Sequence, residues 1–194
     1  MQGKIRRVVT GHDADGKAIV LEDGFAPNIR TNPNRPGHIS TEMWKTNEMP
    51  VVVKAEERDP TEGPKQLHPL PNGTVFRISE VPPETEAMRN IPPEQARAAF
   101  EAMGAGGAST FAQNKRHPFM HRTETVDYAV VLEGEITMLL DEEEVHLRTG
   151  DVVIQRGTNH AWSNRSGKPV KMLYVLINGK FDEDLKGKLG GGGH

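Results

Sequence analysis

The sequence predicts an all-β protein built around a small closed barrel or sandwich, and two observations lead to this prediction. First, residues 111–180 contain one short apolar segment after another, with a turn signal about every 8–12 residues. Second, only 35% of the 194 residues are hydrophobic, whereas the chain holds 20 Gly and 14 Pro. This composition disfavours a helical bundle and a membrane protein, and it suits turn-rich β structure. The length fits one domain with an extended arm.

Residues 1–110 are predicted to form an N-terminal arm of strands, loops and one short helix. Apolar residues on either side of an Asp- and Gly-rich turn predict a hairpin of 5–9 with 18–21. The other expected elements of the arm are a loop over 26–37, a strand over 42–45, a loop over 55–73, a strand over 74–81 and a flexible hinge over 104–109.

Two segments of the arm have the clearest patterns. In the strand over 74–81, alternation places Val75, Arg77 and Ser79 on one face. Over 92–103, two leading prolines, apolar residues at helical spacing and a closing glycine predict a helix.

Residues 111–180 are predicted to form the barrel, and residues 181–194 a flexible tail. A small barrel of this kind surrounds a cavity that can hold one small ligand. The expected strands cover 120–128, 129–132, 135–140, 144–147, 151–155, 160–164 and 170–177.

Composition also limits the chemistry. Cysteine is absent, so any metal must be held by the eight His and by carboxylates. The net charge of −3 gives no support for a nucleic-acid partner. The N-terminus has no apolar run suited to a signal peptide, and no window approaches the ~18 apolar residues of a membrane span. We therefore expect a cytoplasmic enzyme or binding protein whose partner is a small molecule.

Polar residues gather at two places in the predicted barrel. Alternation along 120–128 places His121, Thr123, Thr125 and Asp127 on one face, where a strand face would normally be core or solvent. The segment that follows Gly157 places His160, Trp162 and Asn164 on a common face. Two imidazoles and a carboxylate in a barrel mouth predict a site for a divalent transition metal, Fe, Mn, Ni or Zn.

At these residues the sequence resembles the cupin superfamily. Its first motif, G-x5-H-x-H-x3/4-E-x6-G, is similar in spacing to His121-x-Thr123-x3-Asp127-x6-Gly134. Its second motif, G-x5-P-x-G-x2-H-x3-N, is similar to the series Gly150, Gln155, Gly157, His160 and Asn164, with the first interval one residue short. The resemblance covers about residues 117–165. It implies the cupin double-stranded β-helix, a jelly-roll barrel, and a homodimer with exchanged N-terminal strands.

The resemblance also implies roles for individual residues. His121, Asp127 and His160 take the positions of metal ligands, while Thr123 stands where the family has its second His. Asp127 is alternatively a general base, and we assign Asp127 and Thr123 as the catalytic candidates. His117, four residues before His121, is a reserve metal ligand. The predicted substrate pocket is lined by Arg77, Gln155 and Trp162.

Two functions stay open at this point. The first is a metal-dependent enzyme acting on a small oxygenated metabolite, as a dioxygenase, lyase, dehydratase, decarboxylase or isomerase. The second is a non-catalytic binding or sensor cupin with a degenerate metal site, which Thr123 favours. A storage protein and a His/Tyr epimerase, for which only Tyr128 and Tyr174 are available, are disfavoured. The remaining histidines are expected to be bystanders: His12, His38, His68 and His146.

Overall fold

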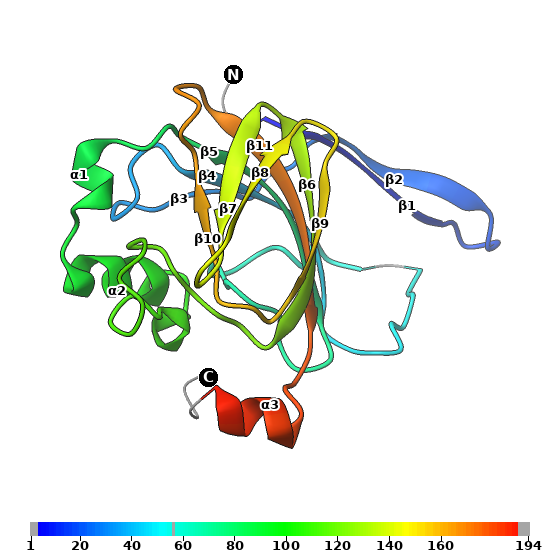
Figure 1. Cartoon of the computed structure of the whole chain (residues 1–194). Coiled ribbons are helices and arrows are strands. Elements are labelled where there is room, and N and C mark those ends of the chain that lie inside the picture. Colours follow the sequence, from blue (N-terminus) through cyan, green and yellow to red (C-terminus); the bar gives the residue numbers. More distant parts are fainter. Residues whose placement is uncertain (1–3, 56, 190–194) are drawn as a thin grey trace.

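The computed structural model describes residues 4–55 and 57–189, and it confirms the predicted all-β class (Figure 1). Two sheets form a jelly-roll barrel, and a separate hairpin extends from it. The larger sheet has the order β3 (Ile29–Thr31), β4 (Ile39–Thr46), β5 (Thr74–Val81), β11 (Val170–Asn178), β6 (Thr125–Glu133) and β9 (Val152–Arg156). The smaller sheet has the order β10 (Ala161–Ser163), β7 (Glu135–Leu139) and β8 (Glu144–Arg148). The hairpin pairs β1 (Arg6–His12) with β2 (Ala18–Phe25).

Helices lie outside the sheets. The predicted helix over 92–103 is present as α2 (Pro93–Glu101) and packs near one end of the barrel (Figure 1). The others are α1 (Glu86–Arg89), the short 3-10 helix η1 (Gly106–Ala108) and α3 (Glu183–Lys188). In the part of the chain that the structure describes, no helix is long and apolar enough to cross a membrane.

Several predicted boundaries are wrong. The two segments predicted over 120–128 and 129–132 are one strand, β6, which begins only at Thr125. Residues 120–124 are not a strand because Pro118 precedes them and because His121 pairs as an isolated bridge with Ser109 and His160. The loop predicted over 26–37 contains the short strand β3.

The arm and the tail also differ from prediction. β3, β4 and β5 all belong to the six-stranded sheet, so the boundary near residue 110 does not divide the sheet. Part of the predicted tail is α3, because the Asp182 side chain caps its first turn by accepting a hydrogen bond from the Leu185 N–H at 2.8 Å. Residues 190–194 of the predicted tail, which include His194, lie outside the described residues.

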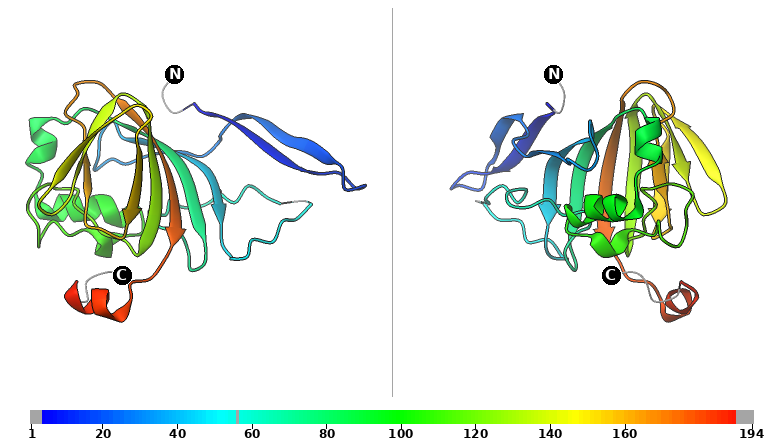
Figure 2. Two further views of the ribbon diagram at one scale, coloured as in Figure 1. Left: turned by 45° about the vertical axis from the view of Figure 1, so that its right-hand side comes forward. Right: turned by 90° about the vertical axis from the view of Figure 1, so that its left-hand side faces the viewer.

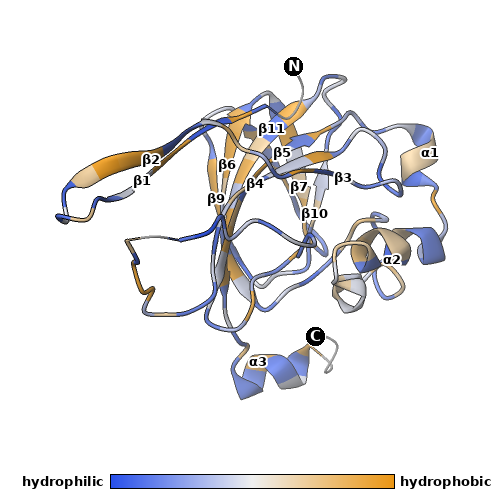
Figure 3. Ribbon diagram, turned by 180° about the vertical axis from the view of Figure 1, so that it is seen from behind, coloured by the Kyte–Doolittle hydropathy of each residue, from blue (hydrophilic) through white to orange (hydrophobic). Residues whose placement is uncertain are grey.

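The barrel interior has an apolar half and a polar half. Ala129, Val131, Met172 and Trp162 belong to a buried cluster between the sheets. A second buried cluster joins α2 to the following loop through Ala99, Phe100, Met103 and Phe119. Figure 3 shows that apolar residues concentrate on the barrel strands, and that β2 carries an apolar stretch of its own. The space between the two clusters holds the polar site.

The β1–β2 hairpin projects away from the barrel (Figure 2), and the buried side chain of Arg7 helps to attach it there. The Arg7 guanidinium donates to Glu22 at 2.6 Å, to Asp59 at 2.7 Å and to the carbonyl oxygen of Met43 at 3.2 Å. The side chains of Arg7 and Asp59 are 7% and 10% exposed. Arg7 thus joins the hairpin, β4 and the loop after it.

We predict that Arg7→Ala lowers the free energy of unfolding by about 3 kcal/mol, because it leaves Asp59 buried without its cation. Urea denaturation followed by circular dichroism measures the change. The matched control is Arg6→Ala, which removes an equally short but exposed pair with Asp23 and should leave stability nearly unchanged. Equal losses in the two variants would contradict the anchoring role of Arg7.

Candidate functional site

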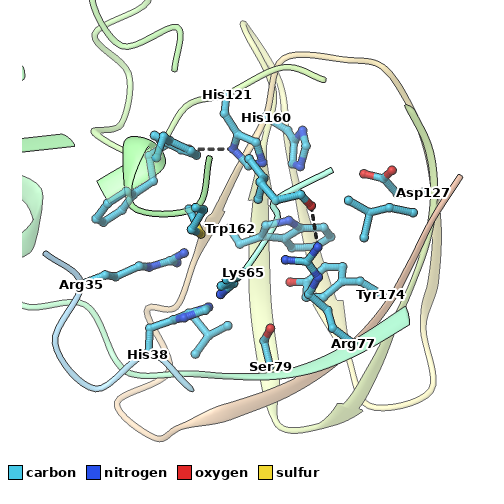
Figure 4. A pocket seen from close by; sticks show the side chains of 16 residues that line it. Arg35, His38, Lys65, Arg77, Ser79, His121, Asp127, His160, Trp162 and Tyr174 are labelled. Carbon is cyan, nitrogen blue, oxygen red and sulfur yellow. Dashed lines mark hydrogen bonds between the residues drawn. The ribbon is translucent and has the colours of Figure 1, made fainter. Parts of the chain in front are cut away.

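The site is a cavity of about 80 Å³ in the barrel, lined by residues of the barrel strands, of α2 and of three loops (Figure 4). The barrel strands supply its floor, and the loops that precede β4, β5 and β6 supply its roof. The lining residues are Arg35, His38, Lys65, Leu67, Arg77, Ser79, Val81, Phe100, Met103, Phe119, His121, Asp127, His160, Trp162, Tyr174 and Leu176.

Strand register places the floor residues. β11 lies between β5 and β6, and Tyr174 is directly opposite Arg77 on one side while Leu176 is opposite Asp127 on the other. Because strand side chains alternate, these residues share the inward face with the apolar core. The face that the sequence assigned to Val75, Arg77 and Ser79 is therefore the face that points into the barrel, where all three are buried.

His121 and His160 lie side by side at the top of the cavity. Each donates its backbone N–H to the carbonyl oxygen of the other at 2.9 Å, and their ring centroids are 4.3 Å apart. Nδ1 of His121 is 3.0 Å from the Phe119 carbonyl oxygen, and Nδ1 of His160 is 3.0 Å from that of Thr158. A carbonyl oxygen only accepts, so each Nδ1 carries the proton and each Nε2 keeps a free lone pair.

The turn before His160 depends on Gly157. Its φ of +61° favours glycine, and a Cβ there would meet the Thr123 carbonyl oxygen and the Phe181 ring. The predicted pocket residue Gln155 lies behind this turn, where its Nε2 donates to the Thr158 carbonyl oxygen at 2.8 Å. Gln155 therefore positions the His160 loop and does not line the cavity.

Both imidazoles are neutral near pH 7. Burial lowers the pKa of His160 to about 4. Burial, followed by the neighbouring His160, lowers the pKa of His121 well below its ordinary value. Neutral rings with exposed Nε2 lone pairs can accept hydrogen bonds from a ligand hydroxyl.

Asp127 is the one carboxyl group among the lining residues. Burial raises its pKa to about 6, although Thr125 and Arg77 oppose the rise. Its Oδ1 is buried without a hydrogen-bond partner among the described residues. A carboxylate with this pKa and a free oxygen suits a general base that works near neutral pH.

Three cationic side chains line the same cavity as Asp127: Arg35, Lys65 and Arg77 (Figure 4), and of these it is the charge of Arg77 that acts on the carboxyl group. Arg35 stacks on Phe119 at 4.6 Å from the ring centroid, and Arg77 donates to the carbonyl oxygens of Gln66 and Leu67. The Nε atoms of both arginines are buried and have no hydrogen-bond partner among the described residues. Unused buried donors next to positive charge favour an anionic oxygen ligand.

Of the other predicted site residues, two line the cavity and two lie outside it. Arg77 and Trp162 line it, as the sequence analysis expected of pocket residues. Thr123 instead lines an outer groove of about 730 Å³ and lies 2.8 Å from Thr125, hydroxyl to hydroxyl. His117 is bound elsewhere: its Nε2 is 2.9 Å from Glu84, and its Nδ1 accepts from the Phe119 N–H.

Sequence reasoning missed Arg35, His38 and Lys65. His38, expected to be a bystander, lines the cavity, where burial and then the charge of Arg35 lower its pKa well below its ordinary value. All three residues come from Pro-rich segments without a strand or helix pattern, so no periodicity marked them. Their basic character in two neighbouring loops was the only available signal.

The donor set does not match the predicted metal centre. His121 and His160 offer adjacent Nε2 atoms, but across 4–55 and 57–189 no group of three or more His, Asp or Glu side chains is arranged to hold a metal ion. His117 uses both of its ring nitrogens within the protein. The facial set of two His and one carboxylate is therefore not assembled by these residues.

The chain is similar to several known proteins. A family model described as Cupin domain matches residues 106–176. Phomopsin biosynthesis cluster protein D of Diaporthe leptostromiformis is 32% identical over 195 residues, covering 96% of this chain and 84% of that protein. The cupin-domain-containing oxidoreductase fogC of Aspergillus ruber is 29% identical over 202 residues, covering 96% and 82%. Among solved structures, the Schizosaccharomyces pombe Cnp3 cupin domain is similar at 12% identity and a TM-score of 0.42, covering 98% of this chain and 97% of that one.

We predict that Asp127→Asn stabilises the protein at pH 8. The raised pKa means that the folded state disfavours the charged carboxylate, by about 3 kcal/mol once it is fully ionised. The penalty is absent below the unfolded pKa near 4, grows as pH rises toward 6, and is constant above. Urea denaturation should show the variant about 2–3 kcal/mol more stable at pH 8, with a much smaller difference at pH 4.5.

The control for this prediction is Asp15→Asn, because the Asp15 side chain is 79% exposed and its removal should leave stability unchanged at both pH values. A gain in Asp127→Asn that is the same at both pH values would contradict the buried charge as its cause.

Proposed function

Because the chain belongs to the cupin superfamily and its barrel encloses a cationic cavity with one unpaired carboxyl group, we propose that it is an enzyme that binds a small anionic, oxygenated metabolite and moves a proton on it. The observation that carries the proposal is that Arg35, Lys65 and Arg77 line the same cavity as Asp127. Several relatives are named as cupin-domain-containing oxidoreductases, which supports an enzymatic role.

The cationic residues determine the chemical class of the ligand. The free Nε atoms of Arg35 and Arg77 suit a carboxylate, an enolate or another oxyanion, because charge-assisted hydrogen bonds are the strongest available in such a site. Trp162 and Phe119 cover the apolar part of the ligand. The Nε2 lone pairs of His121 and His160 accept from a ligand hydroxyl.

Asp127 moves the proton. Near neutral pH its carboxylate accepts a proton from a carbon next to a carbonyl group of the ligand, and the electron pair moves to the carbonyl oxygen. The positive charge of the Arg77 guanidinium stabilises that oxyanion. The same charge also acts on Asp127, so Arg77 lies near the group that takes the proton. Returning the proton to a different atom, or expelling a leaving group, gives the isomerase or lyase class of reaction.

We predict that purified protein exchanges the α-protons of small oxo acids with solvent. In D2O at pH 7, proton NMR of pyruvate and acetoacetate measures the exchange, and Asp127→Asn should slow the protein-dependent rate by at least about 100-fold. Exchange that equals the buffer rate, or that survives in Asp127→Asn, would contradict the proposed reaction.

We predict that binding of the same acids depends on the two arginines. The fluorescence of Trp162, which lines the cavity, reports binding, and its signal is separated from that of Trp44 by a Trp44→Phe background. Arg35→Gln and Arg77→Gln should each weaken binding about 10- to 100-fold, because each removes a charge-assisted hydrogen bond.

The control is Arg97→Gln on the outer face of α2, where the side chain is 69% exposed, and it should bind normally. Two arginine variants are needed because Arg77 also holds the carbonyl oxygens of Gln66 and Leu67, so that loss of binding in Arg77→Gln alone could come from movement of that loop. Unchanged affinity in both variants would contradict the anion site.

A second candidate function is a non-catalytic metabolite sensor. It is favoured by Thr123, which stands at the position of a family metal ligand but bonds to Thr125 and lines the outer groove. In the same assays, a sensor would bind the acids with arginine dependence and would not accelerate proton exchange.

A further inference from the structure

Lys65 lies where the cavity meets the outer groove. The segment 64–68 contributes to the walls of both spaces, and Lys65 and Leu67 line each of them. The segment is fixed in place because Arg77 donates to the carbonyl oxygens of Gln66 and Leu67, and the Leu67 N–H donates to the Met103 carbonyl oxygen at 2.9 Å. The Lys65 side chain is therefore held inside the cavity at its entrance (Figure 4).

The surroundings of Lys65 disfavour its ammonium form. Among the described residues it forms no ion pair, while Arg77 and Arg35 share the same cavity wall. Burial, followed by the charge of Arg77, lowers its pKa to about 7, although Glu42 opposes the change and Arg35 and Arg30 add to it. A buried lysine beside another cation is the arrangement that makes the amine nucleophilic.

We propose that Lys65 is a carbonyl-reactive amine and that the ligand of the cavity is a small 2-oxo acid or a related oxo-anion, which Lys65 binds as an imine. This inference rests on the proposed function and narrows it to a substrate class. The carboxylate of the ligand lies against the free donors of Arg35 and Arg77, and its carbonyl carbon faces Nζ of Lys65. The outer groove gives the ligand a route to the amine.

The step balances without an oxidant or reductant. The Nζ lone pair adds to the carbonyl carbon, and the carbonyl oxygen takes a proton to give a carbinolamine. The nitrogen loses one proton, the C–O bond breaks, and the oxygen takes a second proton and leaves as water, so that amine, carbonyl and one proton become a protonated imine and water. Asp127 lines the same space and can carry the protons. A protonated imine also acidifies the neighbouring C–H bond, which assists its removal by Asp127.

Reductive trapping tests this role directly. The full chain is incubated at pH 7 with pyruvate or glyoxylate and sodium cyanoborohydride, and intact mass and peptide mapping locate the adduct. We expect one adduct per chain, on Lys65, formed at least tenfold faster than on any other lysine. An ordinary lysine is only about 0.04% neutral at pH 7, whereas an amine with a pKa of 7 is half neutral.

Matched variants complete the experiment. Lys65→Arg and Lys65→Gln should abolish the adduct, and the first keeps the positive charge in place. Lys54→Arg, in an exposed part of the same loop between β4 and β5, should change nothing. Lactate, which has the carboxylate but no carbonyl group, should protect Lys65 by competition.

The outcomes separate this inference from the proposed function. Arginine-dependent binding of pyruvate with no adduct on Lys65, or with adducts spread evenly over surface lysines, would overturn the inference and leave the proposed function standing. Proton exchange that persists in Lys65→Arg would also overturn it. An absence of any pyruvate or glyoxylate binding would overturn both.

Discussion

The site depends on one physical constraint, which is that two permanently charged guanidinium groups line the same cavity as one carboxyl group, that of Asp127. Arg35 and Arg77 cannot lose their protons, so the neighbouring groups adjust. His38 is held neutral partly by Arg35, and Lys65 is brought close to neutrality partly by Arg77. Among the residues that line the cavity, positive charge still exceeds negative charge. A bound oxyanion would compensate this excess. Recognition of the ligand and the protonation states of the site thus have the same cause.

The register of the barrel strands supplies this constraint. Along the inward face of β6, Asp127 precedes Ala129 and Val131, so one strand contributes both to the polar site and to the apolar core. Tyr174 on β11 is directly opposite Arg77 on β5, so these two side chains lie at the same height on neighbouring strands. A slip of one residue would send these polar groups to the outer face. The register that builds the core therefore also builds the site.

Sequence alone was informative where a period or a motif existed, and uninformative elsewhere. Alternation gave the bounds of β5 and its inward face, and motif spacing brought attention to His121, His160 and Asp127. The roof could not be predicted because contacts distant in sequence fix it, such as the 2.9 Å hydrogen bond from Asn32 to the Ala99 carbonyl oxygen. Lys65 reaches the cavity for a similar reason, through the contact of its loop with Met103.

The cationic residues also explain how a cupin cavity without an assembled three-ligand set can still activate a bound carbonyl group. A divalent metal acts on such a group by placing positive charge at its oxygen. In the proposed reaction the protonated imine on Lys65 supplies the positive charge and withdraws electrons from the former carbonyl carbon, while Arg35 and Arg77 hold the carboxylate of the ligand. The imidazoles, which hold free Nε2 atoms, then orient a hydroxyl group. Catalysis would accordingly depend on the loops that carry Arg35 and Lys65 as much as on the motif residues of the barrel.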